Sequence, residues 1–127
     1  MKILTILGTR PQFIKSIPLS LALKKYKINE VVADTGQHYD HNMSNIFYEE
    51  FGIKKPSFVG NLSNKSLSRG ERLSEMIGFS QNIILKTKPD FCLVYGDTDS
   101  SLAGSLASSM LSIPICHVES GLRSRNK

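Results

Sequence analysis

The amino-acid sequence predicts an α/β fold, in which a parallel sheet of about five strands alternates with helices. Short apolar runs follow one another along the chain, separated by segments whose apolar residues recur at helical spacing, and this alternation is typical of a parallel sheet. The length of 127 residues corresponds to one domain, because domains usually run about 100 to 200 residues. Hydrophobic residues make up 40% and charged residues 21%, so the chain can bury a core.

The first half of the chain contains three predicted strands. Residues 2–7 form the first strand and residues 30–34 the second, as apolar runs that fit strands covered on both faces. A weak third strand lies at residues 58–59. A helical apolar series follows the first strand, and Pro18 interrupts it. Since proline breaks the helical hydrogen-bond pattern, we expect a kink or a restarted helix there.

The second half contains two predicted helices and two predicted strands. A capping box at residues 68–71 starts a helix that Pro89 ends. Residues 91–95 and 115–118 form the fourth and fifth strands. Between them, residues 100–112 have Leu and Ala on one helical face and small residues on the other. This helix is therefore expected to lie close against the sheet.

Neither a membrane span nor a secretion signal is predicted. The longest apolar runs are far shorter than the roughly 20 residues that cross a bilayer. The N-terminus enters its first strand without the apolar region and cleavage site of a signal peptide, so we expect a cytoplasmic protein. The two cysteines, Cys92 and Cys116, lie in apolar runs and are interpreted as core thiols.

The chain is basic, with 16 Lys and Arg against 11 Asp and Glu, a net charge of +5 and a pI near 9.3. Such a charge can indicate an anionic partner. The lysines, however, cluster near the ends of predicted helices, where a cation interacts favourably with the helix dipole. Aromatic residues that could stack on bases do not alternate with them. The sequence therefore predicts no nucleic-acid partner.

The polar residues that could carry chemistry gather in the loops after the strands. In open parallel sheets, ligands bind outside the carboxyl ends of the strands, where the strand order reverses. With the common order 3-2-1-4-5, Arg10 and Asp97 would face the same cavity, and Glu119 would lie one strand spacing, about 4.8 Å, beyond Asp97. We expect Lys15, one helical turn after the first loop, to line the same cleft.

The first loop can be interpreted in two ways. Gly8 allows close backbone approach, Pro11 suits the first turn of a helix, and Arg10 and Lys15 place two cations near the helix N-terminus, which together can bind a phosphate. The loop lacks the further glycines of a dinucleotide-binding fingerprint and is no Walker loop. The alternative is an ordinary strand-to-helix turn with two solvated cations, and the spacing alone favours neither.

Asp97 and Glu119 suggest a general acid and base, because a crevice that partly dehydrates two carboxylates can separate their pKa values. Each residue also has a structural interpretation. Asp97 can cap the following helix, although Asp99 and Ser100 stand closer to its start. Glu119 can accept hydrogen bonds from the amides of the turn that follows it.

The histidines divide into two kinds. His38 lies in a loop of Gly, Gln, Tyr and Asp that suits ligand contact, whereas His117 lies in an apolar strand and is interpreted as a core or second-layer residue. His38, Asp40 and His41 match no zinc pattern. No metal site is predicted.

At these same loops the sequence resembles the non-hydrolysing UDP-N-acetylglucosamine 2-epimerase family. Five separated blocks fall in the family's order and together span the chain: Gly-Thr-Arg-Pro at 8–11, Thr-Gly-Gln-His at 35–38, Gly-Asp-Thr at 96–98, Ser-Leu-Ala-Gly-Ser-Leu-Ala at 101–107, and His-Val-Glu-Ser-Gly-Leu-Arg at 117–123.

The resemblance implies a glycosyltransferase-B-like enzyme of two Rossmann-like domains, a homodimer without a cofactor. Residues 1–127 would be the incomplete N-terminal domain, with the C-terminal UDP-binding domain absent from this chain. The implied reaction interconverts UDP-N-acetylglucosamine and its manno epimer, or a related UDP-sugar, for surface polysaccharide synthesis. It proceeds by elimination of UDP to a 2-acetamidoglucal and re-addition.

The resemblance also assigns roles to residues. Arg10 and Lys15 match the family's nucleotide and phosphate contacts, and Asp97 and Glu119 match its acid and base carboxylates. The family's third catalytic carboxylate, its catalytic histidine and its uridine pocket lie beyond Lys127. We therefore expect the 127-residue chain alone to be inactive.

Gln37 and His38 are predicted to contact a nucleotide sugar, since they match a Gln-His pair that some members use in a second, regulatory site. Three departures leave the regulation and the exact sugar open. Gln12 stands where the family has Glu, Ser120 where it usually has Ala, and residues 70–71 read Gly-Glu where an Arg-Gln pair would complete the regulatory site. The residues of these motifs resemble those of a subgroup of the family that includes relatives acting on oxidised or diacetamido UDP-sugars.

Two other classes of function fit the same residues. A nucleotide-sugar-binding module would use Arg10 and Lys15 to hold a phosphate without chemistry. A structural domain would pair its cleft edge with another chain.

Overall fold

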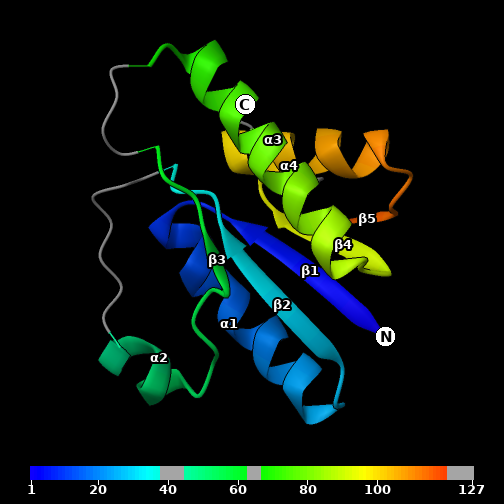
Figure 1. The fold of residues 1–127 in the computed structure, drawn as a ribbon. Helices are drawn as coiled ribbons and strands as arrows, with labels where there is room; N and C mark the ends of the chain where they lie inside the picture. The colour runs from blue at the N-terminus through cyan, green and yellow to red at the C-terminus, as the bar shows by residue number, and fades with distance from the viewer. Residues whose placement is uncertain (38–44, 63–66, 120–127) are drawn as a thin grey trace, which may run out of the picture.

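The computed structural model describes residues 1–37, 45–62 and 67–119. Five strands form one parallel sheet in the order β3-β2-β1-β4-β5 (Figure 1), as predicted from the sequence. The strands are β1 (Lys2–Leu7), β2 (Asn29–Asp34), β3 (Phe58–Val59), β4 (Phe91–Tyr95) and β5 (Ile115–Val118).

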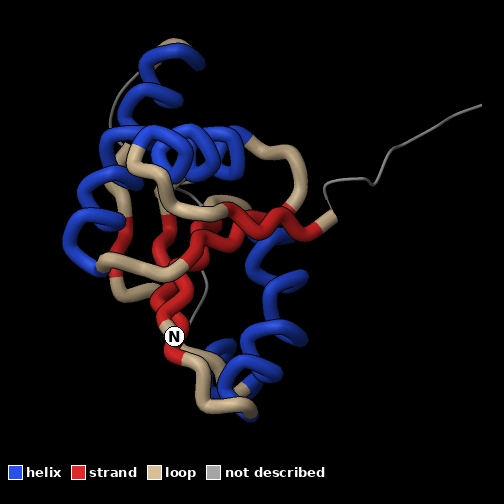
Figure 2. The backbone as a smooth tube through the Cα atoms, turned by 90° about the vertical axis from the view of Figure 1, so that its right-hand side faces the viewer, coloured by secondary structure: helices blue, strands red, loops and turns tan. Residues whose placement is uncertain are grey.

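Helices lie on both sides of the sheet, which Figure 2 shows along its edge. Helix α1 (Arg10–Lys25) covers one face, and α3 (Arg69–Thr87) and α4 (Asp99–Met110) cover the other. A short helix, α2 (Asn45–Phe51), was not predicted. Among the helices of the described residues, none has the length and apolar character that a bilayer crossing requires.

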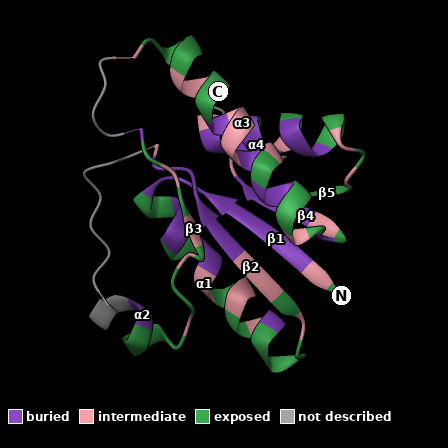
Figure 3. Cartoon of the chain, viewed as in Figure 1, coloured by how far each residue is buried: buried purple, intermediate pink, exposed green. Residues whose placement is uncertain are grey.

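The core has two halves, one on each side of the sheet. Alternate residues of β1 point to opposite faces: Leu4 and Ile6 pack with residues of α3 and α4, whereas Ile3 and Leu7 pack with residues of α1. Strand β1 is buried along nearly its whole length (Figure 3). The loops that follow the central strands therefore start from rigid, buried positions.

Helix α1 runs through Pro18 from Arg10 to Lys25, so the predicted restart of the helix does not occur. Proline removes one backbone donor, which leaves the carbonyl four residues earlier, that of Ile14, without its helical partner. Ile14 and Pro18 are both exposed, so water can satisfy that carbonyl. One lost hydrogen bond on the solvent side does not end the helix.

Helix α4 lies close against the sheet, as its small residues predict. A Cβ atom added at Gly104 would lie 3.0 Å from Cδ1 of Ile6 and 3.2 Å from Cγ1 of Val94. Ala103 and Ala107 are also fully buried. The small side chains bring the N-terminus of α4 close to the ends of β1 and β4, where the predicted site lies.

Strand β5 departs from the predicted burial. Cys116 and His117 are exposed, so the interpretation of Cys116 as a core thiol and the core alternative for His117 were wrong. The physical reason is position, because β5 is the last strand in the sheet and, within the described residues, pairs only with β4. Cys92, in the inner strand β4, is buried as predicted, and this burial raises the pKa of its thiol.

The predicted capping box at the start of α3 is present. The Ser68 hydroxyl accepts a hydrogen bond from the Glu71 backbone N–H at 3.1 Å, and Glu71 Oε1 accepts one from the Ser68 N–H at 2.8 Å. The bond from the Ser68 backbone N–H lowers the pKa of the Glu71 carboxyl.

Replacing Ser68 with Ala is expected to destabilise the chain by about 1 kcal/mol, because an N–H at the helix start loses its acceptor. Urea unfolding measures the change. Ser74→Ala in the same helix is the matched control, since Ser74 is exposed and lies past the first turn. Equal unfolding midpoints for the two variants would show that the box adds nothing to stability.

Candidate functional site

A cavity of about 430 Å³ lies at the carboxyl ends of the central strands. Its lining comes from four parts of the chain that are distant in sequence: Thr9, Pro11, Gln12 and Lys15 at the start of α1, Gln37 after β2, residues 95–99 from the end of β4 to the start of α4, and Glu119 after β5. This is the edge at which ligands bind in open parallel sheets.

Lys15 and Glu119 meet across this cavity. The Nζ atom of Lys15 donates a hydrogen bond to Oε1 of Glu119 at 2.9 Å. The side chains are 52% and 30% exposed, so this ion pair adds at most about 1 kcal/mol to stability. The pair is therefore open to exchange with a ligand that offers its own anionic oxygens to Lys15.

Asp97 lies beside this pair. The backbone N–H of Gly96 donates to the carbonyl of Val118 at 2.9 Å, so the residues that follow them, Asp97 and Glu119, lie on adjacent loops. Glu119 has a φ of 68°, a left-handed conformation that non-glycine residues adopt rarely and often at functional sites. Both predicted carboxylates line the same cavity.

Thr98 caps α4, in place of the predicted Asp99 or Ser100. Its hydroxyl oxygen accepts a hydrogen bond from the Ser101 backbone N–H at 3.3 Å. Asp97 is exposed, and within the described part of the chain its carboxylate has no hydrogen-bond or ion-pair partner. It is thus available for a proton transfer.

Asp99 has a structural role at the rim. Arg69 donates to its two carboxylate oxygens, from Nη2 at 2.6 Å and from Nε at 3.0 Å. This hydrogen bonding lowers the pKa of Asp99 and raises that of Arg69. The pair joins the first turns of α3 and α4.

The remaining predicted site residues are placed differently. Arg10 is the first residue of α1; it is exposed and is not among the residues that line the cavity. Gln37 lines the cavity, but its side-chain oxygen accepts from the backbone N–H of Ser100 at 3.0 Å and from its hydroxyl, so that oxygen also holds the start of α4. His38, with Asp40 and His41, lies outside the described residues.

His117 is exposed but makes a hydrogen bond, between its Nε2 atom and the carbonyl oxygen of Gly96. It thus sits beside the loop that carries Asp97. In the parts of the chain that the structure describes, no cluster of three His, Cys, Asp or Glu side chains is arranged to hold a metal ion.

Gln12 was singled out in the sequence only as a departure from a family pattern. In the structure it is 4% exposed and its side-chain amide contacts residues after both β1 and β4. Its bond to the Thr9 N–H belongs to a capping box that these two residues form at the start of α1, and their spacing is a signal that the sequence analysis did not use. Its partners Tyr95, Thr98 and Ser101 lie 83 to 89 positions away in the sequence, and no local motif signals those contacts.

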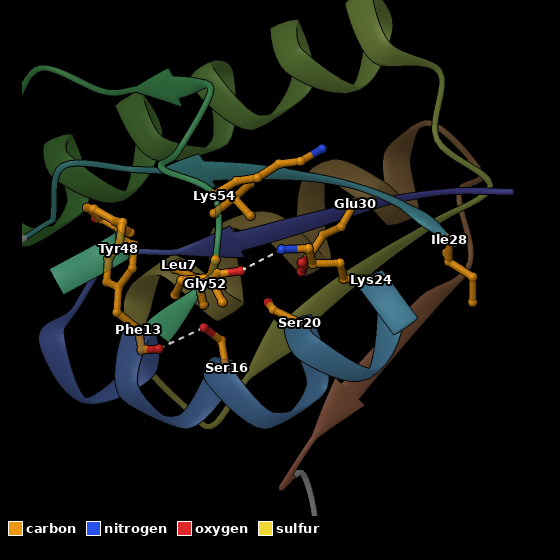
Figure 4. Close-up of a pocket in the computed structure, with 12 residues that line it drawn as sticks. Leu7, Phe13, Ser16, Ser20, Lys24, Ile28, Glu30, Tyr48, Gly52 and Lys54 are labelled. Carbon is orange, nitrogen blue, oxygen red and sulfur yellow. Dashed lines mark hydrogen bonds between the residues drawn. The ribbon is translucent and has the colours of Figure 1, made fainter. Parts of the chain in front are cut away.

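A second cavity, of about 220 Å³, lies beneath α1 (Figure 4). Apolar side chains such as Phe13 and Tyr48 form much of its wall. One of its two lysines, Lys24, donates to the backbone carbonyl of Gly52 at 3.2 Å. None of the predicted site residues that the structure describes lines this cavity, so the candidate site is the one at the strand ends.

Comparison with known proteins gives consistent results. A family model described as UDP-N-acetylglucosamine 2-epimerase matches residues 21–127. A Pseudomonas aeruginosa protein named UDP-2,3-diacetamido-2,3-dideoxy-D-glucuronate 2-epimerase is 49% identical over 127 residues, which are 99% of this chain and 35% of that protein. A Methanococcus maripaludis protein named UDP-N-acetylglucosamine 2-epimerase homolog is 50% identical over 124 residues, 98% of this chain and 34% of that protein.

Solved structures agree. The crystal structure of Methanocaldococcus jannaschii UDP-GlcNAc 2-epimerase in complex with UDP-GlcNAc and UDP superposes with a TM-score of 0.85 at 44% identity, over 98% of this chain and 34% of that one. The chain thus spans about a third of the length of the relatives it matches.

Proposed function

Because the chain belongs to the UDP-N-acetylglucosamine 2-epimerase family, we propose that it forms part of an enzyme that inverts C2 of a UDP-2-acetamido sugar. The observation that carries this proposal is the meeting of Lys15, Asp97 and Glu119 in one cavity at the strand ends. A cation for a diphosphate and two carboxylates for proton transfer are what the reaction requires.

The chemistry can be assigned to these side chains. One carboxylate of the Asp97 and Glu119 pair accepts the proton from C2 while the C1–O bond to UDP breaks and its electron pair leaves with UDP. The product is a sugar with a C1=C2 double bond. A proton is then delivered to the opposite face of C2, and the UDP oxygen adds back to C1. Lys15 stabilises the negative charge on the departing UDP, and no cofactor takes part.

The substrate class follows from what the relatives share. One relative is named for a diacetamido glucuronate and another was solved with UDP-GlcNAc; both sugars carry UDP at C1 and an acetamido group at C2. We propose this common unit as the substrate of the present protein, in surface polysaccharide synthesis.

The proposal also concerns the rest of the molecule. Residues 1–127 would form most of an N-terminal Rossmann-like domain, and a second α/β domain would bind the uridine and close the cleft. The homodimer, the cytoplasmic location and substrate contacts by Arg10, Gln37 and His38 stay predictions of the family resemblance.

The direct test is solvent exchange at C2, measured in a polypeptide extended through the second domain. Proton NMR in deuterium oxide is expected to show both epimers and loss of the C2 proton signal. A well-folded protein that binds UDP but never incorporates deuterium would instead be a nucleotide-sugar-binding module, the alternative left open by the sequence.

Lys15→Met in that extended polypeptide is expected to weaken UDP binding by about tenfold, the loss of one charge-assisted contact of about 1.4 kcal/mol. Isothermal titration calorimetry at low and high salt measures the loss, and the salt dependence should fall with it. Lys25→Met is the matched control, since Lys25 is an exposed lysine of the same helix outside the cavity. Unchanged UDP affinity in Lys15→Met would remove Lys15 from the binding site.

A further inference from the structure

We propose that Gln12 is a positioning residue that fixes the loop carrying Asp97 against the start of α1, which carries Lys15. The inference rests on the proposed function, because Asp97 and Lys15 are the groups it would align. Its basis is the set of hydrogen bonds that the Gln12 amide makes inside the protein.

One end of the amide binds the loop after β1. The side-chain oxygen of Gln12 accepts from the backbone N–H of Gly8 at 2.9 Å and from that of Thr9 at 3.2 Å. A carbonyl oxygen has two lone pairs, and both are used here. The oxygen therefore connects the first turn of α1 to the two residues that link β1 to this helix.

The other end binds the loop after β4. The side-chain nitrogen donates to the carbonyl oxygen of Tyr95 at 2.7 Å and to the hydroxyl of Thr98 at 2.8 Å, and lies 3.2 Å from the hydroxyl of Ser101. Asp97 stands between Tyr95 and Thr98 in the chain, so the amide holds the backbone of Tyr95 on one side of it and the side chain of Thr98 on the other.

This role gains weight because no hydrogen bond or ion pair among the described residues holds the Asp97 carboxylate itself. Its position depends on the loop around it, which is held by the Gly96 bonds to β5 and by the Gln12 bonds to Tyr95 and Thr98. Gln12 is 4% exposed, and a buried amide with all its partners satisfied is rigid. A displacement of about 1 Å in a reacting group can cost about 100-fold in rate, so precise anchoring of this loop matters for catalysis.

The polarity of the partners calls for an amide. The N–H groups of Gly8 and Thr9 can only donate, and the carbonyl of Tyr95 can only accept. A carboxylate at position 12 would satisfy the first two but would place an oxygen against the Tyr95 oxygen. The Thr98 hydroxyl can turn to donate to a carboxylate. The Ser101 hydroxyl already donates to the Tyr95 carbonyl, and that carbonyl has no proton to donate. A glutamate, which the family has at this position, therefore makes the bonds to both loops only while its carboxyl is protonated.

The test compares Gln12→Glu and Gln12→Met with the control Gln81→Glu in the extended polypeptide. Gln81 lies on α3 outside the cavity, and its side-chain nitrogen donates a hydrogen bond to the Met110 sulfur at 3.4 Å. Both kcat and KM for C2 exchange are measured from about pH 5 to about pH 8. Gln12→Met is expected to lower kcat by about 10- to 100-fold, with KM changed much less.

Gln12→Glu is expected to show a rate that falls, relative to the parent protein, as the pH rises and the carboxyl loses its donor proton. A purely structural role for Gln12 would not produce this change in the pH profile. A kcat equal to that of the parent at every pH in either Gln12 variant would overturn the proposal.

Backbone amide exchange, measured by NMR, keeps the test independent of turnover. The amides of Gly8 and Thr9 are expected to exchange faster in Gln12→Met and at the parent rate in Gln81→Glu. If Gln12→Met does not fold, Gln12→Glu at low and high pH supplies the same comparison. A parent protein without C2 exchange would refute the proposed function alone, whereas parent-like exchange at Gly8 and Thr9 would refute the role of Gln12.

Discussion

Asp97→Asn and Glu119→Gln are each expected to lower kcat for C2 exchange by about 10²- to 10⁴-fold, the usual contribution of a positioned general acid or base. An amide cannot take up or deliver the C2 proton, while its size leaves the cavity unchanged. Substrate affinity should therefore change much less than kcat. The measurement is deuterium incorporation at C2 in the extended polypeptide, followed by proton NMR.

That experiment has two controls. Glu75→Gln removes an exposed carboxylate of α3 outside the cavity and should leave the rate unchanged. The 127-residue chain alone should show no exchange, because binding energy from the uridine helps to organise the transition state. Parent-like turnover in Asp97→Asn would exclude that residue from the chemistry, and turnover by the short chain would show that the second domain is dispensable.

Gly8→Ala is expected to destabilise the chain by about 1 to 3 kcal/mol or more. The added Cβ would lie 2.0 Å from the Ser100 hydroxyl oxygen and 2.5 Å from that of Thr35. These two hydroxyls are hydrogen bonded to each other at 2.8 Å and are buried, so neither can retreat without breaking that bond.

Gly78→Ala is the matched control, because it makes the same chemical change in the interior of α3. A Cβ at Gly78 meets no atom within 4 Å, and alanine favours a helix over glycine by up to about 1 kcal/mol. The two substitutions should thus shift the free energy of unfolding in opposite directions in urea titrations. A stabilising Gly8→Ala would mean that the loop after β1 can move away from α4.

The strands were predictable because their signal is local. Residues 2–7, 91–95 and 115–118 are the bounds of β1, β4 and β5 in both the prediction and the structure. The burial of β5 was not predictable, since Cys116 and Ile115 have the composition of an inner strand and only the sheet order makes them an edge. Helix α2 was missed because its seven residues lie between stronger signals.

The candidate site was predictable in outline, because polar residues after parallel strands meet at one edge. Thr98 as the cap was missed, since Thr, Asp and Ser all cap helices well and follow one another here. The contacts of Gln12 with Tyr95, Thr98 and Ser101 were missed for a different reason: which distant carbonyl a buried glutamine meets depends on how closely β1 and β4 pack. The spacing between β1 and β4 depends on the whole fold, so a short sequence motif does not predict it.

The exposed edge of β5 has a practical consequence for work with the isolated chain. An edge strand presents unpaired backbone donors and acceptors that can template pairing with another molecule, and Cys116 on this strand carries an exposed thiol that can oxidise to a cross-link between two chains. Aggregates formed in this way would hide the cavity or distort titrations of UDP. Binding measurements on these 127 residues therefore require a low protein concentration and a reducing agent.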